Sequence, residues 1–243
     1  MAGAPSAVAV VLRGVFRHFG RFVALRPLDE SFPAARLYAV LGDNGAGKST
    51  LLRVMAGLLP PSRGSVIVFH PREPGLGVGE PATMRARIGY MAHASLLYDE
   101  LDAMENLLYF AGLYGIREGG VCERAMRAVH LDPALKRRVG QYSQGMRQRL
   151  SLARAIVHQP ELLFLDEPFS NVDAGSARDM VQVLAGMRDA GCTLFVVTHQ
   201  ASLLAGVADE FVWMAGGRIV ARTRKLEAQS PLAVPAPGQE VVR

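Results

Sequence analysis

The chain has few cysteines and no long apolar stretch. Cys122 and Cys192 are its two cysteines among 243 residues, and they fit no metal or disulfide spacing, which favours a reducing compartment. The longest apolar stretches, such as Leu162–Leu165 and Thr193–Val197, have the length of a strand, whereas a membrane-spanning helix needs roughly 18–20 residues. The N-terminus lacks the charged start and apolar core of a secretion signal. We therefore expect a chain that neither spans a membrane nor is secreted.

Lysine is also scarce, because only Lys48, Lys136 and Lys225 occur. The formal net charge of +5 is carried mainly by arginine, as expected of a GC-rich genome. No basic run interleaved with aromatic residues is present, so we expect no nucleic-acid partner. Hydrophobic residues make up 50% of the sequence, which is ample for a buried core.

A phosphate-binding loop is the most specific motif. Residues 42–50 read Gly-Asp-Asn-Gly-Ala-Gly-Lys-Ser-Thr, a complete G-x-x-x-x-G-K-[ST] pattern, and they follow the apolar run Leu37–Leu41 and precede a helical segment. The glycines let successive N–H groups point at phosphate oxygens, Lys48 reaches the β- and γ-phosphates, and the Ser49 hydroxyl holds Mg²⁺. The expected nucleotide contacts are Gly42, Asp43, Asn44, Gly45, Ala46, Gly47, Lys48, Ser49 and Thr50.

Two adjacent acids complete the expected catalytic site. Asp166 and Glu167 directly follow the apolar strand Leu162–Leu165, and the carboxyl ends of strands are where open α/β sheets bind ligands. Asp166 would hold Mg²⁺ through water, and Glu167 would polarise the water that attacks the γ-phosphate.

A second anion site is possible at Ser143. This serine is a candidate N-cap for a partly buried helix, with Gly145 two residues further on. Taken alone, the segment fits an ordinary capped helix equally well.

Strands alternate with helices along most of the chain. Alternating β and α segments imply a sheet that is largely parallel in its core. His70–Pro81 is expected to be a loop, and residues 226–243 a mobile tail. The expected strands are Ala7–Arg13, Phe22–Leu25, Glu30–Phe32, Leu37–Leu41, Ser65–Phe69, Ile88–Met91, Leu162–Leu165, Leu194–Thr198, Glu210–Met214 and Arg218–Arg222. The expected helices are Ser49–Leu58, Met104–Leu113, Val121–Val129, a helix after Ser143, Ser176–Ala190 and Ser202–Val207.

This ordered set of motifs resembles the ATP-binding subunit of an ABC transporter over residues 8–222. The resemblance implies an α/β fold, with a P-loop NTPase (RecA-like) core, a small antiparallel β subdomain and a helical signature subdomain at about 94–157. Tyr142–Met146 is similar to the family signature LSGGQ: Ser143 and Gly145 are kept, and the other three positions differ. In this family the signature of one subunit caps the ATP on the phosphate loop of a second, in a homodimer or heterodimer.

The resemblance assigns further roles. Ser170–Asp173 resembles the D-loop that crosses the dimer interface, and His199 resembles the switch histidine that reaches the γ-phosphate. Phe19 resembles the aromatic residue that stacks on adenine, with Phe16 and Phe22 as nearby competitors. His93 stands where the family usually has a glutamine that contacts the nucleotide, Mg²⁺ and the membrane partner. Mg²⁺ prefers oxygen ligands, so a histidine is a poor substitute as a direct ligand. We therefore expect His93 to have a coupling role or to be a solvated loop residue.

The expected function is an ATPase subunit that uses ATP and Mg²⁺ and powers a separate transmembrane permease. Such a subunit would be cytoplasmic and peripheral, on the inner face of the membrane. A DNA-repair relative would need a long coiled coil before the signature, but Lys48 and Ser143 are only 143 − 48 = 95 residues apart and no heptad run lies between them. A ribosomal relative would carry two modules, and a GTPase would need an Asn-Lys-x-Asp motif, which the chain lacks.

The segment from His93 to Gly115, together with Tyr142–Met146, is similar to the ATP-binding subunits of haem exporters in cytochrome c maturation. The alternative is a subunit of a drug, lipid or polysaccharide exporter, or a non-transport ABC ATPase. Selectivity lies in the membrane partner, so the sequence leaves the transported molecule open.

Overall fold

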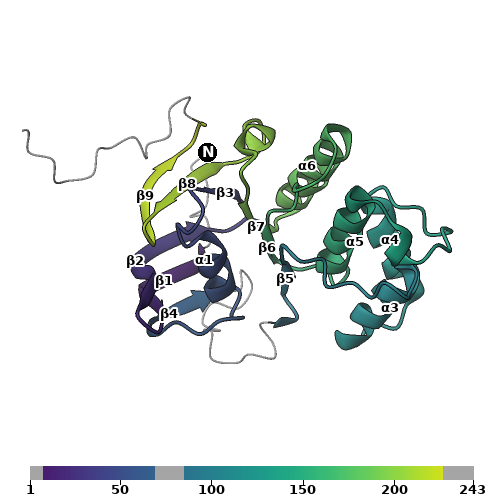
Figure 1. Ribbon diagram of the computed structural model, residues 1–243, viewed down its shortest axis with the longest axis horizontal. Coiled ribbons are helices and arrows are strands. Elements are labelled where there is room, and N and C mark those ends of the chain that lie inside the picture. The colour runs from purple at the N-terminus through teal and green to yellow at the C-terminus, as the bar shows by residue number, and fades with distance from the viewer. Residues whose placement is uncertain (1–7, 69–84, 227–243) are drawn as a thin grey trace, which may run out of the picture.

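The fold combines two sheets with helices on both sides of the larger one (Figure 1). The computed structural model describes residues 8–68 and 85–226. A three-stranded antiparallel sheet has the order β2-β1-β4, and a six-stranded sheet has the order β5-β6-β7-β3-β8-β9. The expected loop at His70–Pro81 and the expected tail beyond Leu226 lie outside the described residues.

The elements have the following bounds. The strands are β1 Val8–Phe19, β2 Phe22–Pro33, β3 Leu37–Leu41, β4 Arg63–Val68, β5 Ile88–Met91, β6 Leu162–Asp166, β7 Thr193–Val197, β8 Glu210–Ala215 and β9 Arg218–Thr223. The helices are α1 Lys48–Met55, α3 Ala103–Leu113, α4 Gly119–Ala128, α5 Gln144–Ile156 and α6 Ala174–Asp189, with 3₁₀ turns at Val139–Gln141 and Ala201–Leu204.

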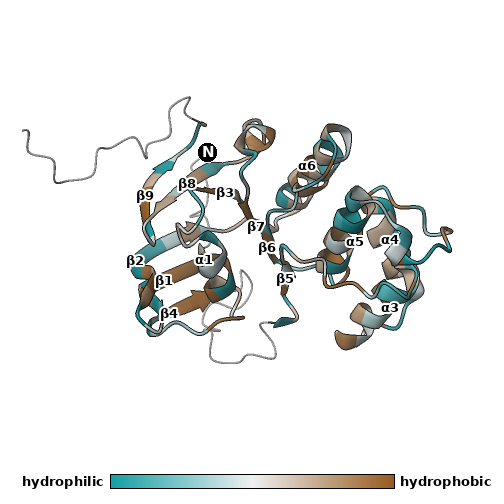
Figure 2. Ribbon diagram, in the orientation of Figure 1, coloured by the Kyte–Doolittle hydropathy of each residue, from teal (hydrophilic) through white to brown (hydrophobic). Residues whose placement is uncertain are grey.

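The six-stranded sheet is parallel except for its last strand. β5, β6, β7, β3 and β8 pair in parallel, and β9 pairs antiparallel with β8, so the predicted parallel core is confirmed. Successive residues of these buried strands alternate between two hydrophobic clusters, and Figure 2 shows β3, β6 and β7 in brown. On one face Phe195 stacks between Tyr38 and Phe164, with ring centroids 4.8 and 5.2 Å apart.

Each face of the large sheet has its own cover. The cluster around Phe195 includes α1 and the inner face of the antiparallel sheet. The other cluster includes α3, α4, α5 and α6. Helix α1 follows β3 on one face of the sheet, and helix α6 follows β6 on the other face. The first turns of both helices therefore lie near the carboxyl ends of these two strands.

Four predicted elements differ from the structure. The strand expected over Ala7–Arg13 is longer, because β1 continues to Phe19. Phe22–Leu25 and Glu30–Phe32 were expected as separate strands, but they belong to one continuous strand, β2. This strand lies at a sheet edge, where Pro27 needs no N–H partner. Register shifts between β1 and β2 accommodate the irregular residues between the two predicted strands. The helix expected over Ser202–Val207 is only the 3₁₀ turn Ala201–Leu204; Gly206, a weak helix former, follows it.

The helices α3, α4 and α5 fall within the predicted helical region of about 94–157. A capping box begins α3: Asp102 accepts from the Glu105 N–H, and Glu105 accepts from the Asp102 N–H, each at 2.8 Å. Within the described ranges 8–68 and 85–226, no helix combines the length and apolar character needed to span a bilayer.

Candidate functional site

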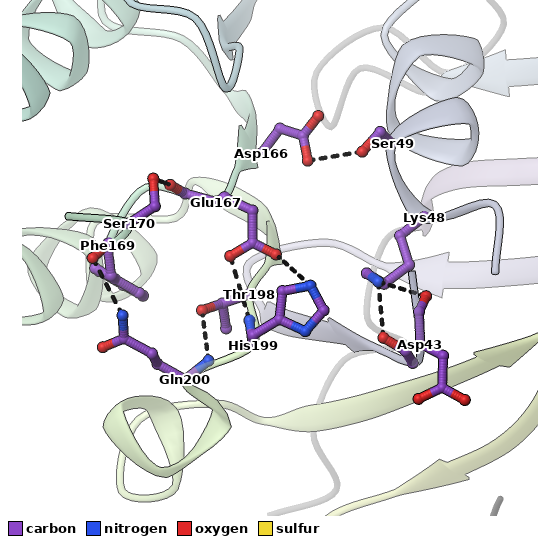
Figure 3. A network of polar contacts seen from close by, with 11 residues as sticks. Asp43, Lys48, Ser49, Asp166, Glu167, Phe169, Ser170, Thr198, His199 and Gln200 are labelled. Carbon is purple, nitrogen blue, oxygen red and sulfur yellow. Dashed lines mark hydrogen bonds and ion pairs between the residues drawn. The ribbon is translucent and has the colours of Figure 1, made fainter. Parts of the chain in front are cut away.

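The phosphate-binding loop folds around its own lysine. Lys48 is the first residue of α1 and is only 6% exposed. Its Nζ donates to the carbonyl oxygens of Gly42 and Asp43, at 2.7 and 2.9 Å (Figure 3). Burial lowers the pKa of Lys48, and the carboxylates of Glu167, Asp166 and Asp43 oppose that shift. A buried cation therefore lies at the centre of the loop, held by the loop's own carbonyl groups.

Two loop glycines are also required by packing. A Cβ at Gly42 would lie 2.1 Å from the carbonyl oxygen of Met214, and one at Gly47 would lie 2.6 Å from that of Ala24. Both residues have positive φ, 142° and 99°. The sequence explained these glycines by phosphate approach alone; the structure adds their contact with β8 and β2.

Replacing Gly42 by alanine is therefore expected to destabilise the fold by about 2–4 kcal/mol, because strain and steric overlap each cost about 1–3 kcal/mol. The measurement is denaturant unfolding. Gly112→Ala is the control: this glycine is helical and nothing lies within 4 Å of its added Cβ, so the variant should be as stable as wild type or more so. Equal midpoints for Gly42→Ala and wild type would contradict the assignment.

The carboxyl end of β6 faces the start of α1. The Ser49 hydroxyl donates to Asp166 Oδ1 at 2.9 Å, and Asp166 is 2% exposed. A hydroxyl and a carboxylate this close form an oxygen-donor pair of the kind that Mg²⁺ prefers, with room in its coordination for water and phosphate. The donor set thus fits the metal that the sequence predicts here.

Glu167 has a strained backbone and a carboxylate that points toward His199. Its φ is 54°, in the left-handed region that non-glycine residues rarely adopt. Oε2 accepts from the His199 backbone N–H at 3.2 Å, and Oε1 lies 3.3 Å from His199 Nε2 (Figure 3). Burial raises the pKa of Glu167, against the lowering effect of His199 and Lys48. A carboxyl group with a raised pKa is suited to accepting a proton.

These side chains line one cavity of about 710 Å³. Asn44, Gly45, Gly47, Lys48, Ser49, Thr50, His93, Asp166, Glu167 and His199 are the predicted site residues that line it. Ser170 and Asn171 of the predicted D-loop and the competitor Phe22 line it as well. Four further lining residues have no predicted role: Ala24, Arg53, Val197 and Gln200. Two of these had a signal in the sequence, because Arg53 lies one helical turn after Ser49 and Gln200 directly follows His199.

Phe19 does not line this cavity, and Phe22 does. The two residues pair across the β1–β2 hairpin, with side chains that are 46% and 60% exposed. The Arg17 guanidinium lies over the Phe19 ring, 4.5 Å from its centroid. Phe22, the competitor, therefore lines the cavity, and Phe19 lies directly opposite it across the hairpin. The assignment of Phe19 as the residue that stacks on adenine stays a prediction.

Ser143 and Gly145 lie outside the cavity as well. Ser143 caps α5, since its Oγ accepts from the Met146 N–H at 3.3 Å, so the predicted N-cap is confirmed. A Cβ at Gly145 would lie 3.7 Å from Asp173 Oδ2. Within one chain, the start of α5 therefore lies beside the turn before α6, and Figure 1 shows α5 beside α4 and away from α1.

Known proteins share this sequence pattern. The sequence model of the family described as "ABC transporter" matches residues 25–170, more than half of the chain. The chain is 33% identical to the probable multidrug ABC transporter ATP-binding protein YbhF of Escherichia coli K12, over 81% of this chain and 34% of YbhF. It thus spans about a third of that relative's length.

Two further relatives match most of their own length. The daunorubicin/doxorubicin resistance ATP-binding protein DrrA of Streptomyces peucetius is 34% identical over 92% of this chain and 68% of its own. The aliphatic sulfonates import ATP-binding protein SsuB 2 of Pseudomonas aeruginosa is 36% identical over 87% of this chain and 74% of its own.

Solved structures share the fold. An ATP-binding subunit of an ABC transporter matches with a TM-score of 0.77 and 25% identity, over 89% of this chain and 90% of that one. The ATP-binding cassette MJ0796, as a dimer in a post-hydrolysis state bound to ADP and Pi, matches with a TM-score of 0.77 over 88% of this chain and 98% of that one. At 22% identity, this second likeness concerns the fold alone.

Proposed function

The chain belongs to the ABC transporter family, and we propose that it is the ATP-hydrolysing subunit of a transporter with a separate permease. The observation that carries this proposal is the single cavity in which the phosphate-binding loop faces Asp166, Glu167 and His199. The direct test is hydrolysis of ATP by the purified full-length chain with Mg²⁺. An absence of both ATP binding and hydrolysis would reject it.

Several side chains of the site have a defined role in this proposal. The Lys48 ammonium would leave the carbonyls of Gly42 and Asp43 for the β- and γ-phosphates, while loop N–H groups hold the other phosphate oxygens. Glu167 would accept the proton of the attacking water, and His199 would hold the γ-phosphate. Ser49 and Asp166 would hold Mg²⁺, which supplies positive charge beside the phosphates when bound. Phe19, or its hairpin partner Phe22, would stack on adenine.

A second copy, or a related subunit, would complete the site. Ser143 and Gly145 lie outside the cavity of their own chain, and Ser143 is exposed at the positive N-terminal end of α5. We propose that this end caps the nucleotide held by the second subunit in a head-to-tail dimer.

Exposed apolar side chains favour a permease as the membrane partner. Among the described residues, eleven large hydrophobic side chains are exposed, and six of them come from residues 96–114. Such exposed apolar side chains are typical of a protein-binding surface. They come shortly after His93 in the sequence, and His93 is itself exposed and lines the cavity. A permease bound to it would hold the chain at the inner face of the membrane, with His93 between nucleotide and partner.

His93 is therefore expected to couple the two proteins. In His93→Ala, basal ATPase of the isolated subunit should fall modestly, because Lys48 and Glu167 remain, whereas transport by the reconstituted complex should fall about tenfold or more. His93→Gln should restore most of the transport. The measurement is ATPase and transport side by side, with His130→Ala, exposed at the end of α4, as control. Wild-type transport by His93→Ala would make the residue an ordinary loop histidine.

We propose haem-type export for cytochrome c maturation as the transport function, supported by the motif residues between His93 and Gly115 and by Tyr142–Met146. The names of two relatives, which concern multidrug transport and drug resistance, favour the alternative of a drug, lipid or polysaccharide exporter. The name of the third concerns sulfonate import and favours neither. Purification of the chain with its membrane partner, followed by ATPase assays with haem and with daunorubicin, separates the two. Stimulation by haem supports the proposal, and stimulation by the drug alone overturns it.

A further inference from the structure

Gln148 joins helix α5 to the turn that follows β6. It lies on the buried face of α5 and is 8% exposed. Its Nε2 donates to the backbone oxygen of Ser170 at 3.4 Å and to Ser170 Oγ at 3.3 Å. One side-chain amide therefore connects the signature helix with the turn after Glu167.

The direction of these hydrogen bonds follows from the hydroxyl of Ser170. Ser170 Oγ lies 3.0 Å from the backbone oxygen of Glu167 and donates to it (Figure 3). A hydroxyl has one hydrogen, so Ser170 Oγ can only accept from Gln148. This assigns the nitrogen of the Gln148 amide, and not its oxygen, to the side facing Ser170.

Ser170 in turn holds the strained backbone of Glu167. The Glu167 N–H donates to Val197 of β7 at 2.9 Å, and the Glu167 carbonyl accepts from the N–H of Ser170 at 3.2 Å as well as from its hydroxyl. A non-glycine residue at positive φ persists only where its surroundings enforce it. Ser170 supplies the hydrogen bonds on the carbonyl side of this residue.

Stability does not account for an amide at position 148. Gln148 Oε1 is buried and has no hydrogen-bond partner within residues 8–68 and 85–226. An unpartnered buried oxygen lowers stability, and an apolar side chain of similar size would avoid that loss. The donation to Ser170 is the one polar role that the structure shows for this side chain.

We infer that Gln148 is a positioning residue for ATP hydrolysis: through Ser170 it ties the backbone of Glu167 to the orientation of α5. Gln148 does not line the cavity and so acts only through Ser170. The inference rests on the proposed function. If so, helix α5 affects two nucleotide sites. Its first turn, with Ser143, would cap the nucleotide of the second subunit, and Gln148 would position the Glu167 carboxylate of its own subunit.

The test compares Gln148→Leu, Ser170→Ala and the double variant with wild type, using full-length protein. Steady-state kcat and KM for ATP are measured together with the unfolding temperature. We expect kcat of Gln148→Leu to fall about tenfold, since small misplacements of a catalytic group cost this much or more, with KM unchanged and unfolding at or near the wild-type temperature. The double variant should lose no more than the slower single variant. Gln182→Leu, at an exposed position of α6, should match wild type.

Three results would overturn the inference: an unchanged kcat in Gln148→Leu, a parallel loss of kcat and unfolding temperature, or fully additive losses in the double variant. Should Gln148→Leu not fold, the leucine is not tolerated and the stability argument is wrong. Ser170→Ala then decides the remaining link, because a wild-type kcat in it would end the proposal. Inactive wild-type protein would reject the proposed function itself, whereas active wild type with an equally active Gln148→Leu would reject only this inference.

Discussion

Replacing Lys48 by alanine is expected to lower ATP turnover by at least about 10²–10³-fold and to remove most ATP binding. The loss follows from charge, because Lys48 is the only cation within the loop of residues 42–50, and a preorganised cation beside transferring phosphate is among the strongest catalytic contributions. The other lysines cannot replace it: Lys136 pairs with Asp102 at 3.6 Å in the helical region, and Lys225 follows β9. ATPase assays and calorimetric titration with ATP measure the effect.

The matched control for this variant is Lys136→Ala. The Lys136 side chain is exposed, and its partner Asp102 keeps its hydrogen bond from the Glu105 N–H without it. Activity and unfolding should therefore stay near wild-type values. Wild-type turnover in Lys48→Ala would show that the 710 Å³ cavity is not the catalytic site. Loss of activity in both variants would point to a general effect of removing lysine.

Replacing Glu167 by glutamine should separate binding from chemistry. The amide keeps the size of the side chain and an oxygen that can accept from the His199 N–H, but it cannot take up a proton. We expect kcat to fall about 10²–10⁴-fold, the usual contribution of a general base, with ATP binding intact. Two chains should then remain joined around unhydrolysed ATP, and size-exclusion chromatography with ATP and Mg²⁺ should show a dimer.

The Glu167→Gln substitution is expected to lower activity without lowering the stability of the fold. Burial raises the pKa of Glu167 above its usual range, so the ionised carboxylate is less favourable in the folded chain than in the unfolded one. Stability from this group is therefore lost as pH rises from the usual pKa of a glutamate through the raised one. A neutral amide avoids that loss, and Glu167→Gln should unfold at the wild-type temperature or above it near neutral pH.

The control is Glu123→Gln, at an exposed position of α4 where Glu123 pairs with Arg127. It should hydrolyse ATP like wild type and should not form the ATP-dependent dimer. A Glu167→Gln variant that stays monomeric at high concentration would count against the head-to-tail dimer. One that hydrolyses ATP at the wild-type rate would remove Glu167 from the proposed mechanism.

The sequence alone was sufficient for features that depend on neighbouring residues. The loop at residues 42–50 lies between an apolar strand and a helix, and Asp166 and Glu167 stand at the end of another apolar strand. In both cases the same short stretch of sequence predicts the motif and the secondary structure around it. Parallel strands end on the same side of their sheet, which is why Ser49 and Asp166 could be expected to meet before their 2.9 Å contact was seen. The N-cap at Ser143 is equally local.

Other features depended on packing between segments distant in the chain. Phe22 lines the cavity because of how the β1–β2 hairpin lies against the loop, and the need for Gly42 follows from the backbone of Met214 in β8. The link from Gln148 to Ser170 joins a helix and a turn that no sequence spacing relates. Such contacts are set by the way the two hydrophobic clusters bring the elements together, because a side chain's partner across an interface has no fixed offset along the chain.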